Sequence, residues 1–356
     1  MAEEKQRRIR LALIGCGSHS SGNHARPMQA YAADHPDALE LAAACDLDMA
    51  RAEKFCEQFG FLKAYESLEK MLEAEQLDGC VSVMPMHLIT PQGKDLLERG
   101  MPCMLEKPLG TSLEEIRGLD EVARRTGTPH MVSVNRRFNP YLRRALAWMN
   151  ERGGFHALRA TIIRQGRTVR NFLWSTAFHT VDAMRFLAGE IESYRWQATE
   201  REGMTNKWLT IAFKYANGCL GHLDVLPTAG RHEELYELIG EEYRAMVVTE
   251  HNRKPTTLQC WHGEVCELDV AAPDDEPGHI AIGPYHEVEE FVTALRSGRA
   301  PWPTVADVLP SNEVCFAIAE PEGLWRASPS EHGRTKRSGA TLQNDCDRTM
   351  GRESAG

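Results

Sequence analysis

Between residues 9 and about 135, short apolar runs alternate with amphipathic segments in which apolar residues recur every three or four positions. Strict alternation of strand and helix indicates a parallel sheet, because parallel neighbours need crossover connections. We therefore expect a doubly wound domain of the α/β class over residues 1–135. The expected strands cover residues 9–14, 39–45, 61–65, 79–84, 102–105 and 130–134, and the expected helices cover residues 49–59, 68–75, 91–99 and 113–125.

From about residue 136 the pattern changes, and runs of strand character follow one another. Asn217-Gly218 separates two of them and is typical of a tight two-residue hairpin, in which both positions need positive φ. We expect a second α/β domain over residues 136–320 with a mainly antiparallel sheet. The polar tail, residues 321–356, has too few large apolar residues for a core, so we expect it to be disordered. The expected strands cover residues 155–164, 194–198, 207–215, 219–226 and 243–248, and the expected helices cover residues 175–188, 285–296 and 305–319.

The 356 residues carry a formal net charge of -10 without a long basic run, which argues against nucleic acid or an anionic membrane as the main partner. The apolar run near the N-terminus is too short for a signal peptide or a membrane span, so a cytoplasmic location is expected. The ten cysteines form no C-x-x-C pair and several lie in strand-like runs, which indicates reduced core residues. Because the net charge argues against nucleic acid and membranes, a small molecule is the expected partner.

The first candidate site is the loop after the first expected strand, ALIGCGSHSSGNHARP. Gly15 and Gly17 permit the tight turn and the close backbone approach that a pyrophosphate requires, and the next helix N-terminus attracts the anion. Ser18 and His19 continue this candidate cofactor surface. Ser20 stands where G-x-G-x-x-G has its third glycine, so an ordinary strand-to-helix turn remains the alternative.

The end of the second expected strand, AAACDLD, carries an acidic candidate. In dinucleotide folds an acid at this place hydrogen-bonds the adenosine ribose. Asp46 lies 29 residues after Gly17, more than the usual spacing of about 20 residues, and the long polar loop absorbs part of the excess. Its carboxylate would repel a 2′-phosphate, so NAD is expected rather than NADP, although Arg51 lies nearby.

Residues 104–110 read MLEKPLG, which places Glu106 and Lys107 directly after an apolar run. Ligands bind at the carboxyl ends of the strands in open α/β sheets, so Lys107 is expected beside the reactive ring of the cofactor. Glu106 is expected to contact the same cofactor and to orient Lys107 through an ion pair. A surface lysine followed by a turn proline is the alternative interpretation.

Taken together, these motifs resemble the Gfo/Idh/MocA family, the relatives of glucose–fructose oxidoreductase and inositol dehydrogenase. The resemblance rests on GCGSHS, ACDLD, VSVMP ending at Pro85, GMPCMLEKPLG, VNRRFNP and FHTVDAMRFLAG, and it extends from about residue 9 to 320. It implies a Rossmann domain with Pro85 at the cofactor, followed by an α/β domain whose open antiparallel sheet often mediates oligomers. It also implies pyridine-nucleotide-dependent oxidation or reduction of a sugar, cyclitol or related polyol, with Lys107 and His179 in the active site.

The residue types suit this chemistry. Hydride transfer from a carbinol carbon requires loss of the hydroxyl proton, so a base must lie within hydrogen-bond reach of that oxygen. His179 can accept the proton, while Lys107 as a cation stabilises the developing alkoxide. Ser175 and Asp182 share a helix face with His179 and are candidates for substrate binding, together with Arg137. The structural alternatives are a helix N-cap for Ser175, a packed histidine for His179, an ordinary helix acid for Asp182 and a solvated junction residue for Arg137.

The leading hypothesis is an NAD(H)-dependent oxidoreductase that acts on a secondary alcohol or ketone of a sugar-like substrate and assembles as a homo-oligomer. No metal is expected, because the histidines later in the chain show no ligand spacing. Many members of the family carry an aspartate at the position of Ser175. A non-catalytic NAD-binding sensor therefore remains an alternative, as does a glycosidase that retains its NAD and oxidises the substrate transiently.

Overall fold

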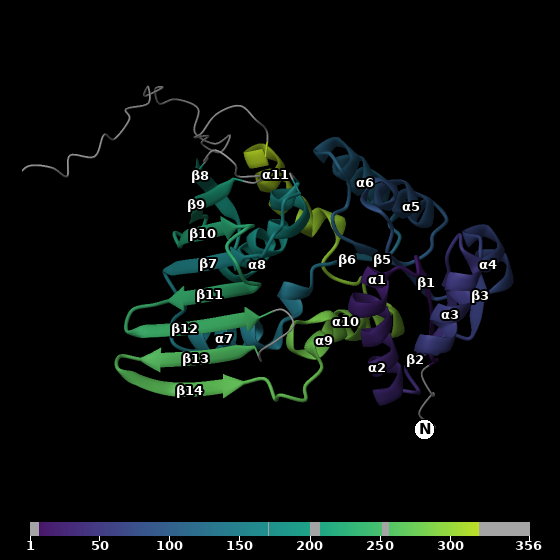
Figure 1. The fold of residues 1–356 in the computed structure, drawn as a ribbon, viewed down its shortest axis with the longest axis horizontal. Coiled ribbons are helices and arrows are strands. Elements are labelled where there is room, and N and C mark those ends of the chain that lie inside the picture. The colour runs from purple at the N-terminus through teal and green to yellow at the C-terminus, as the bar shows by residue number, and fades with distance from the viewer. Residues whose placement is uncertain (1–6, 170, 200–206, 251–255, 320–356) are drawn as a thin grey trace, which may run out of the picture.

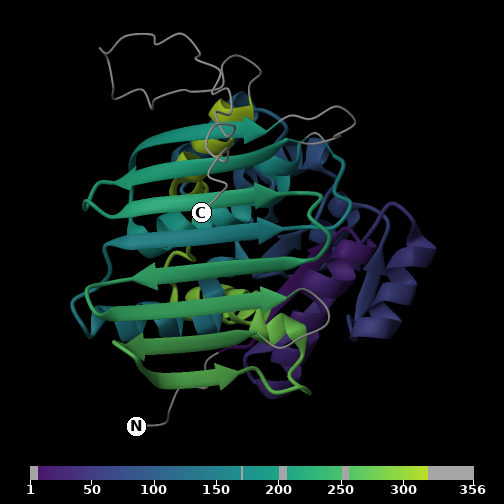
Figure 2. The same cartoon turned by 60° about the vertical axis from the view of Figure 1, so that its left-hand side comes forward.

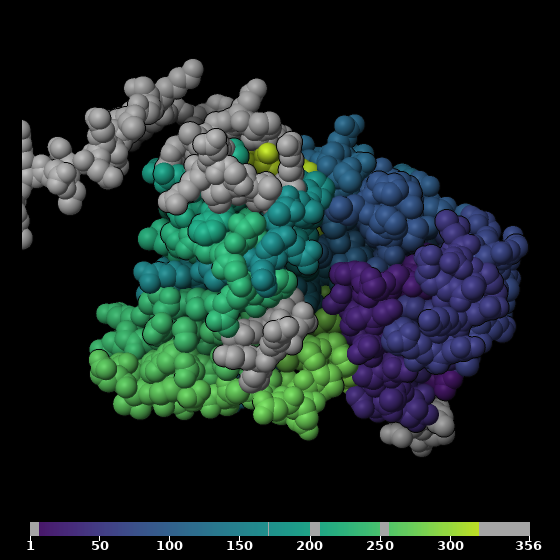
Figure 3. All heavy atoms as spheres, in the orientation of Figure 1, coloured from purple at the N-terminus to yellow at the C-terminus, as the bar shows by residue number. Residues whose placement is uncertain are grey.

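The computed structural model describes residues 7–169, 171–199, 207–250 and 256–319. Two sheets with their helices lie side by side, the N-terminal one in purple and blue and the C-terminal one in teal and green (Figure 1). The space-filling view shows the two halves in contact (Figure 3). The tail for which disorder was expected, 321–356, lies outside the described residues.

The first sheet has six parallel strands in the order β3-β2-β1-β4-β5-β6. Its inner strands are buried on both faces, as β1 is along nearly all of its length, which is the burial typical of a parallel sheet covered by helices on both sides. The doubly wound parallel sheet expected from the sequence is therefore confirmed. Its elements are β1 (Ile9–Ile14), α1 (Ser18–Ser20), η1 (Ser21–Ala25), α2 (Arg26–Asp34), β2 (Leu39–Cys45), α3 (Met49–Phe59), β3 (Lys63–Tyr65), α4 (Leu68–Ala74), β4 (Gly79–Ser82), α5 (Met86–Glu98), β5 (Cys103–Glu106), α6 (Leu113–Thr126) and β6 (His130–Ser133).

Local sequence signals explain most of the helix ends. Asp48 accepts a hydrogen bond from the backbone N–H of Arg51 and so caps α3, and Gly60 ends that helix in the left-handed conformation. One helix begins earlier than expected. The expected start at residue 91 was wrong, because α5 runs through Pro91 and gives up one backbone hydrogen bond there.

The second sheet has eight strands in the order β14-β13-β12-β11-β7-β10-β9-β8. All neighbours are antiparallel except β10 and β7, which pair in parallel, so the mainly antiparallel sheet is confirmed. Strands β11, β13 and β14 and helix α7 were not predicted from the sequence. The elements are η2 (Asn135–Phe138), α7 (Pro140–Asn150), β7 (Ala157–Ile163), η3 (Leu173–Ala177), α8 (Phe178–Ala188), β8 (Ile191–Thr199), β9 (Trp208–Tyr215), β10 (Leu220–Leu226), β11 (Glu233–Ile239), β12 (Tyr243–Glu250), β13 (Thr257–His262), β14 (Val265–Ala271), α9 (Gly278–Ala281), α10 (Pro284–Ser297) and α11 (Val305–Ala319).

The hairpin at Asn217-Gly218 exists, but its geometry differs from the expectation. Gly218 has φ 88°, whereas Asn217 has no positive φ. The N–H of Gly218 donates to the carbonyl of Tyr215, and the N–H of Tyr215 donates to the carbonyl of Cys219. These bonds fit a three-residue loop in which a type I turn is followed by one left-handed glycine, so only one position needs positive φ.

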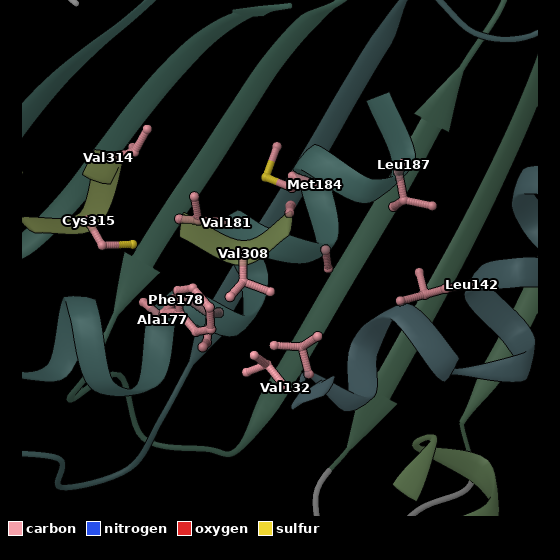
Figure 4. Packing of buried hydrophobic residues seen from close by; sticks show 14 of the residues in the cluster. Val132, Leu142, Ala177, Phe178, Val181, Met184, Leu187, Val308, Val314 and Cys315 are labelled. Atoms are coloured by element: carbon pink, nitrogen blue, oxygen red, sulfur yellow. The ribbon is translucent and has the colours of Figure 1, made fainter. Parts of the chain in front are cut away.

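One face of the second sheet is covered by helices, and the other face carries none among the described residues (Figure 2). Helices α7 and α8 pack against the covered face, and α11 lies between α8 and the α6 side of the first sheet. Phe178, Val181 and Met184 of α8 meet Val308 and Cys315 of α11 in this shared apolar cluster (Figure 4). We propose that the two sheets mark two domains divided near residue 135, with α10 and α11 of the later segment returning to pack on the first.

Two features of the described residues bear on expectations from the sequence. Their nine cysteines are all free, and eight of them are buried. Within the same residues, every helix is too short or too polar to span a bilayer.

Gly283, just before α10, tests how this helix packs against the linker that joins the two sheets. Its φ is 106°, and a Cβ atom there would lie 2.1 Å from the carbonyl oxygen of Asn135. We predict that Gly283→Ala lowers the free energy of unfolding by about 2–4 kcal/mol. The alanine would be strained at this positive φ, and its Cβ atom would also overlap the backbone of Asn135.

Urea unfolding followed by circular dichroism measures this change. Gly278→Ala is the matched control, because a Cβ atom there meets nothing within 4 Å. Equal stability of the two variants would contradict the assignment.

Candidate active site

The first loop lies close against the segment after β4 at Gly15 and is open at Gly17. Gly15 adopts φ 92°, and a Cβ atom on it would lie 2.1 Å from the carbonyl oxygen of Val83. A Cβ atom on Gly17 would meet nothing within 4 Å, so the space beside this residue is open. Ser20, which replaces the third glycine of the usual motif, is buried, and its hydroxyl donates to the carbonyl of Gly15. Ser18 and His19 follow on the exposed side of the loop.

Asp46 lies at the end of β2, next to this loop. Its carboxylate accepts the backbone N–H of Cys16 at 2.9 Å and that of Asp48 at 3.0 Å, and Arg51 lies 3.2 Å away. A cavity of about 460 Å³ opens beside these groups. Its wall brings together several predicted cofactor residues and an apolar side, with Gly15, Asp46, Leu47, Arg51, Met84, Pro85 and Leu88 among its lining residues.

At the end of β5, Glu106 and Lys107 point to different sides, because side chains alternate along a strand. Glu106 accepts hydrogen bonds from His24 at 2.6 Å and from His19 at 3.2 Å. Burial by itself would raise the pKa of Glu106, but these two bonds outweigh it and hold the pKa well below the ordinary value. The expected ion pair between Glu106 and Lys107 is replaced by these histidine contacts.

Lys107 reaches the C-terminal half of the molecule. Its Nζ donates a 3.0 Å hydrogen bond to the backbone carbonyl of Ser175. Burial lowers the pKa of Lys107 to about 8, and the nearby charge of Arg136 acts in the same direction, while Glu106 opposes the shift. An ammonium carries three N–H donors, so Lys107 can bind a substrate oxygen as well as this carbonyl.

His179 lies one helical turn after the carbonyl that Lys107 binds. Ser175 belongs to a π-helical turn, Leu173–Ala177, that runs into α8, so it is not the helix N-cap considered from the sequence. His179 is buried, and its Nδ1 has no hydrogen-bond partner. Burial, followed by the positive charges of Arg136 and Lys107, keeps the pKa of His179 well below its ordinary value. The imidazole is therefore neutral near pH 7 and can accept a proton.

Arg137 and Asp182, two candidates for substrate contact, bind each other. Two hydrogen bonds of 2.7 Å join them, both side chains are buried, and Ser311 donates a third bond to Asp182. The guanidinium of Arg137 also lies over the ring of Trp302. Because the two side chains bind each other at the junction of the two halves, we propose that the pair positions α8 and does not contact a substrate.

Sequence reasoning did not identify a buried charged group next to Lys107 and His179. Glu234 on β11 receives hydrogen bonds from Arg136, from Arg164 at the end of β7, and from the hydroxyl of Tyr236. The partners are up to 98 residues apart in the chain, so no local pattern shows them. His24 was missed for the same reason, since Glu106 lies 82 residues away.

Comparison with known proteins agrees with this geometry. Residues 9–135 match the Gfo/Idh/MocA family, described as an oxidoreductase family with an NAD-binding Rossmann fold. The rhizopine catabolism protein MocA of Rhizobium meliloti is 24% identical over 88% of this chain and 95% of its own length. An inositol 2-dehydrogenase of Corynebacterium glutamicum strain R is 25% identical over 82% of this chain and 86% of its own length.

A solved structure gives the same fold. An oxidoreductase from Agrobacterium radiobacter in complex with NAD+, L-tartaric acid and magnesium superimposes with a TM-score of 0.69 at 19% identity, covering 90% of this chain and 98% of its own. The first sheet of the present chain is accordingly an NAD-binding Rossmann domain.

Two glycines of the first loop should respond differently to the same substitution. We predict that Gly17→Ala leaves thermal stability near that of the wild type and raises the Kd for NAD at least about tenfold. The added methyl group would keep a diphosphate from the backbone N–H groups, whose charge-assisted bonds are worth about 1.5–3 kcal/mol each.

Gly15→Ala is the comparison, because it should lower stability through its overlap with Val83. Calorimetric titration with NAD and thermal unfolding distinguish the two effects. A Gly17→Ala protein that binds NAD as tightly as the wild type would show that the loop does not hold the diphosphate.

Proposed function

Because the chain belongs to the Gfo/Idh/MocA family of oxidoreductases, we propose that it is an NAD(H)-dependent enzyme that transfers hydride between nicotinamide and a secondary alcohol or ketone. We infer a sugar, cyclitol or related polyol as the substrate, and the inositol dehydrogenase among the relatives supports this class. The observation that carries the proposal is the 3.0 Å hydrogen bond from Lys107 to Ser175, because it joins the cofactor edge of the first sheet to the helix of His179.

The residues present fit a dinucleotide. The open space beside Gly17 suits a diphosphate, and the cavity beside Asp46 offers a carboxylate for the ribose and an apolar wall for the adenine. The carboxylate favours NAD over NADP, although Arg51 partly neutralises it. A bound NAD would supply the hydride acceptor for the alcohol that Lys107 binds.

The proposed chemistry divides the work between two side chains. Lys107 donates a hydrogen bond to the alcohol oxygen and stabilises the negative charge that develops there. His179, which is neutral, takes the hydroxyl proton when the alcohol is oxidised to the ketone. In the reverse direction His179 returns the proton. Ser175 contributes its backbone carbonyl, so no carboxylate at this position is needed to hold Lys107.

We expect Lys107→Met and His179→Ala each to lower turnover by roughly a hundredfold to ten-thousandfold, the usual contribution of a positioned acid or base. The Kd for NAD should change little, because neither side chain is assigned to the diphosphate or the adenosine. Steady-state assays with a panel of sugars, inositols and their acids, with NAD and NADP in parallel, measure the first quantity, and fluorescence titration measures the second.

Lys54→Met, which removes an exposed ammonium from α3, is the matched control and should behave as the wild type. Nucleotide that stays bound without net reduction would favour the glycosidase alternative. Nucleotide affinity without redox activity on any polyol, together with no effect of Lys107→Met, would favour the sensor.

The open face of the second sheet supports the proposed homo-oligomer. Eight strands of about seven residues cover roughly 34 Å by 23 Å, on the order of 800 Å², which is the area that each partner buries in a standard interface. The positions on the open side of the strands include Leu220, which is exposed, and Leu235 and Val248, which are half-buried. A second copy of the chain would cover this face.

We predict that Leu235→Lys, in the middle of this face, converts the oligomer to a smaller species without loss of secondary structure. Two or more buried ammonium groups would otherwise meet in the interface. Light scattering coupled to size-exclusion chromatography reports the mass. Leu62→Lys, at an exposed leucine of the N-terminal half, is the control, and an unchanged mass for Leu235→Lys would rule out this face as the interface.

A further inference from the structure

Three side chains converge between the first loop and the end of β5. The Nε2 atom of His24 lies 2.6 Å from one oxygen of Glu106, and the Nε2 atom of His19 lies 3.2 Å from the other. The three potential ligand atoms are all within 4.8 Å of one another. His24 and Glu106 are buried, whereas the side chain of His19 is 54% exposed.

The backbone of the first loop is shaped to bring the two histidines together. In an α-helix, residues five apart point about 140° away from each other, since each residue turns the chain by about 100°. In a π-helix the i to i+5 hydrogen bond places such residues nearly above one another. Residues Ser21–Ala25 form a π-helical turn directly after α1, and this turn brings His24 to the same side as His19. Such turns are rare and occur frequently at functional sites.

Two imidazole nitrogens and one carboxylate form a donor set that binds first-row divalent metals well, and zinc in particular. Typical zinc bonds of about 2.0–2.2 Å put ligand atoms roughly 3.3 Å apart. The distance of 3.2 Å between His19 and Glu106 matches this spacing, and an ion would separate His24 from Glu106 beyond their present 2.6 Å. Three protein ligands leave one position for solvent.

The cluster holds one carboxylate and two imidazoles, and the neighbouring ammonium of Lys107 is directed away from it, to the carbonyl of Ser175. On binding, the metal would take the place of the two hydrogen bonds between the histidines and Glu106.

We propose that His19, His24 and Glu106 form a binding site for a divalent transition metal, with Zn²⁺ as the best-fitting ion. A bound ion would link the exposed start of the glycine-containing loop to the end of β5. This site does not depend on the proposed oxidoreductase activity, since its ligands and their geometry are present without nucleotide or substrate.

The test uses the full chain, treated with chelator and dialysed, without nucleotide. Titration with Zn²⁺ alone in a calorimeter should show one saturable site that His19→Ala weakens more than tenfold, because loss of a ligand costs more than the 10–100-fold typical of an outer-shell partner. Because the side chain of His19 is exposed, we expect its replacement to leave the fold intact, and circular dichroism checks this. His87→Ala, at another exposed histidine of the same sheet edge, is the matched control and should leave the affinity unchanged.

Glu106→Gln is the second variant, since it keeps the shape of the side chain and removes its charge. With Co²⁺ as the probe, the wild type should show visible absorption bands of a four- or five-coordinate ion, and both His19→Ala and Glu106→Gln should lose them. Absence of saturable Zn²⁺ binding by the wild type, or equal affinity in the wild type and both ligand variants, would overturn the proposal.

Discussion

Neighbouring side chains on a strand point to opposite sides, and at the end of β5 this alternation separates two charges. Glu106 turns to the first loop, where two histidines bind its carboxylate. Lys107 turns to the other half of the molecule, where it donates a hydrogen bond to the carbonyl of Ser175. A slip of the strand by one residue would exchange the two, because the side-chain period is two. The buried ladders of β5 with β4 and β6 fix the register. The dipeptide Glu106-Lys107 therefore contacts both the first loop, through Glu106, and the turn that leads into the helix of His179, through Lys107.

The junction between the two halves is built from paired charges. Glu234 holds Arg136 and Arg164, and Asp182 holds Arg137, all with buried side chains. Taking such ions out of water costs roughly several kcal/mol each, which their attraction repays only in good geometry. We interpret these pairs as devices that fix the orientation of η2 and α8, and the positive side of the network also keeps His179 neutral.

Local periodicity was sufficient for elements whose burial follows a regular pattern. The bounds of β1, β2, α3 and α11 were predicted to the residue. The two strands are nearly continuous apolar runs, and in the two helices buried residues recur mostly every three or four positions. Strand β11 was missed because Glu234 occupies one of its inward positions, and only ion pairs with distant arginines make that burial possible. The same limit applies to the site. The roles suggested for Lys107 and His179 came from motifs, whereas the contacts of Glu106 with His24 and of Lys107 with Ser175 join residues that only the fold brings together.

The parallel pairing of β7 with β10 has a consequence for the order in which the chain acquires its structure during translation. All strands of the first sheet are complete once residue 133 has left the ribosome. Strand β7, at residues 157–163, lies at the centre of the second sheet, but both of its neighbours come later, starting at residues 220 and 233. Strands that are far apart in the sequence pair slowly, and a central strand exposes apolar side chains until its neighbours have been synthesised. The C-terminal half is therefore the part of the nascent protein that would gain most from a chaperone.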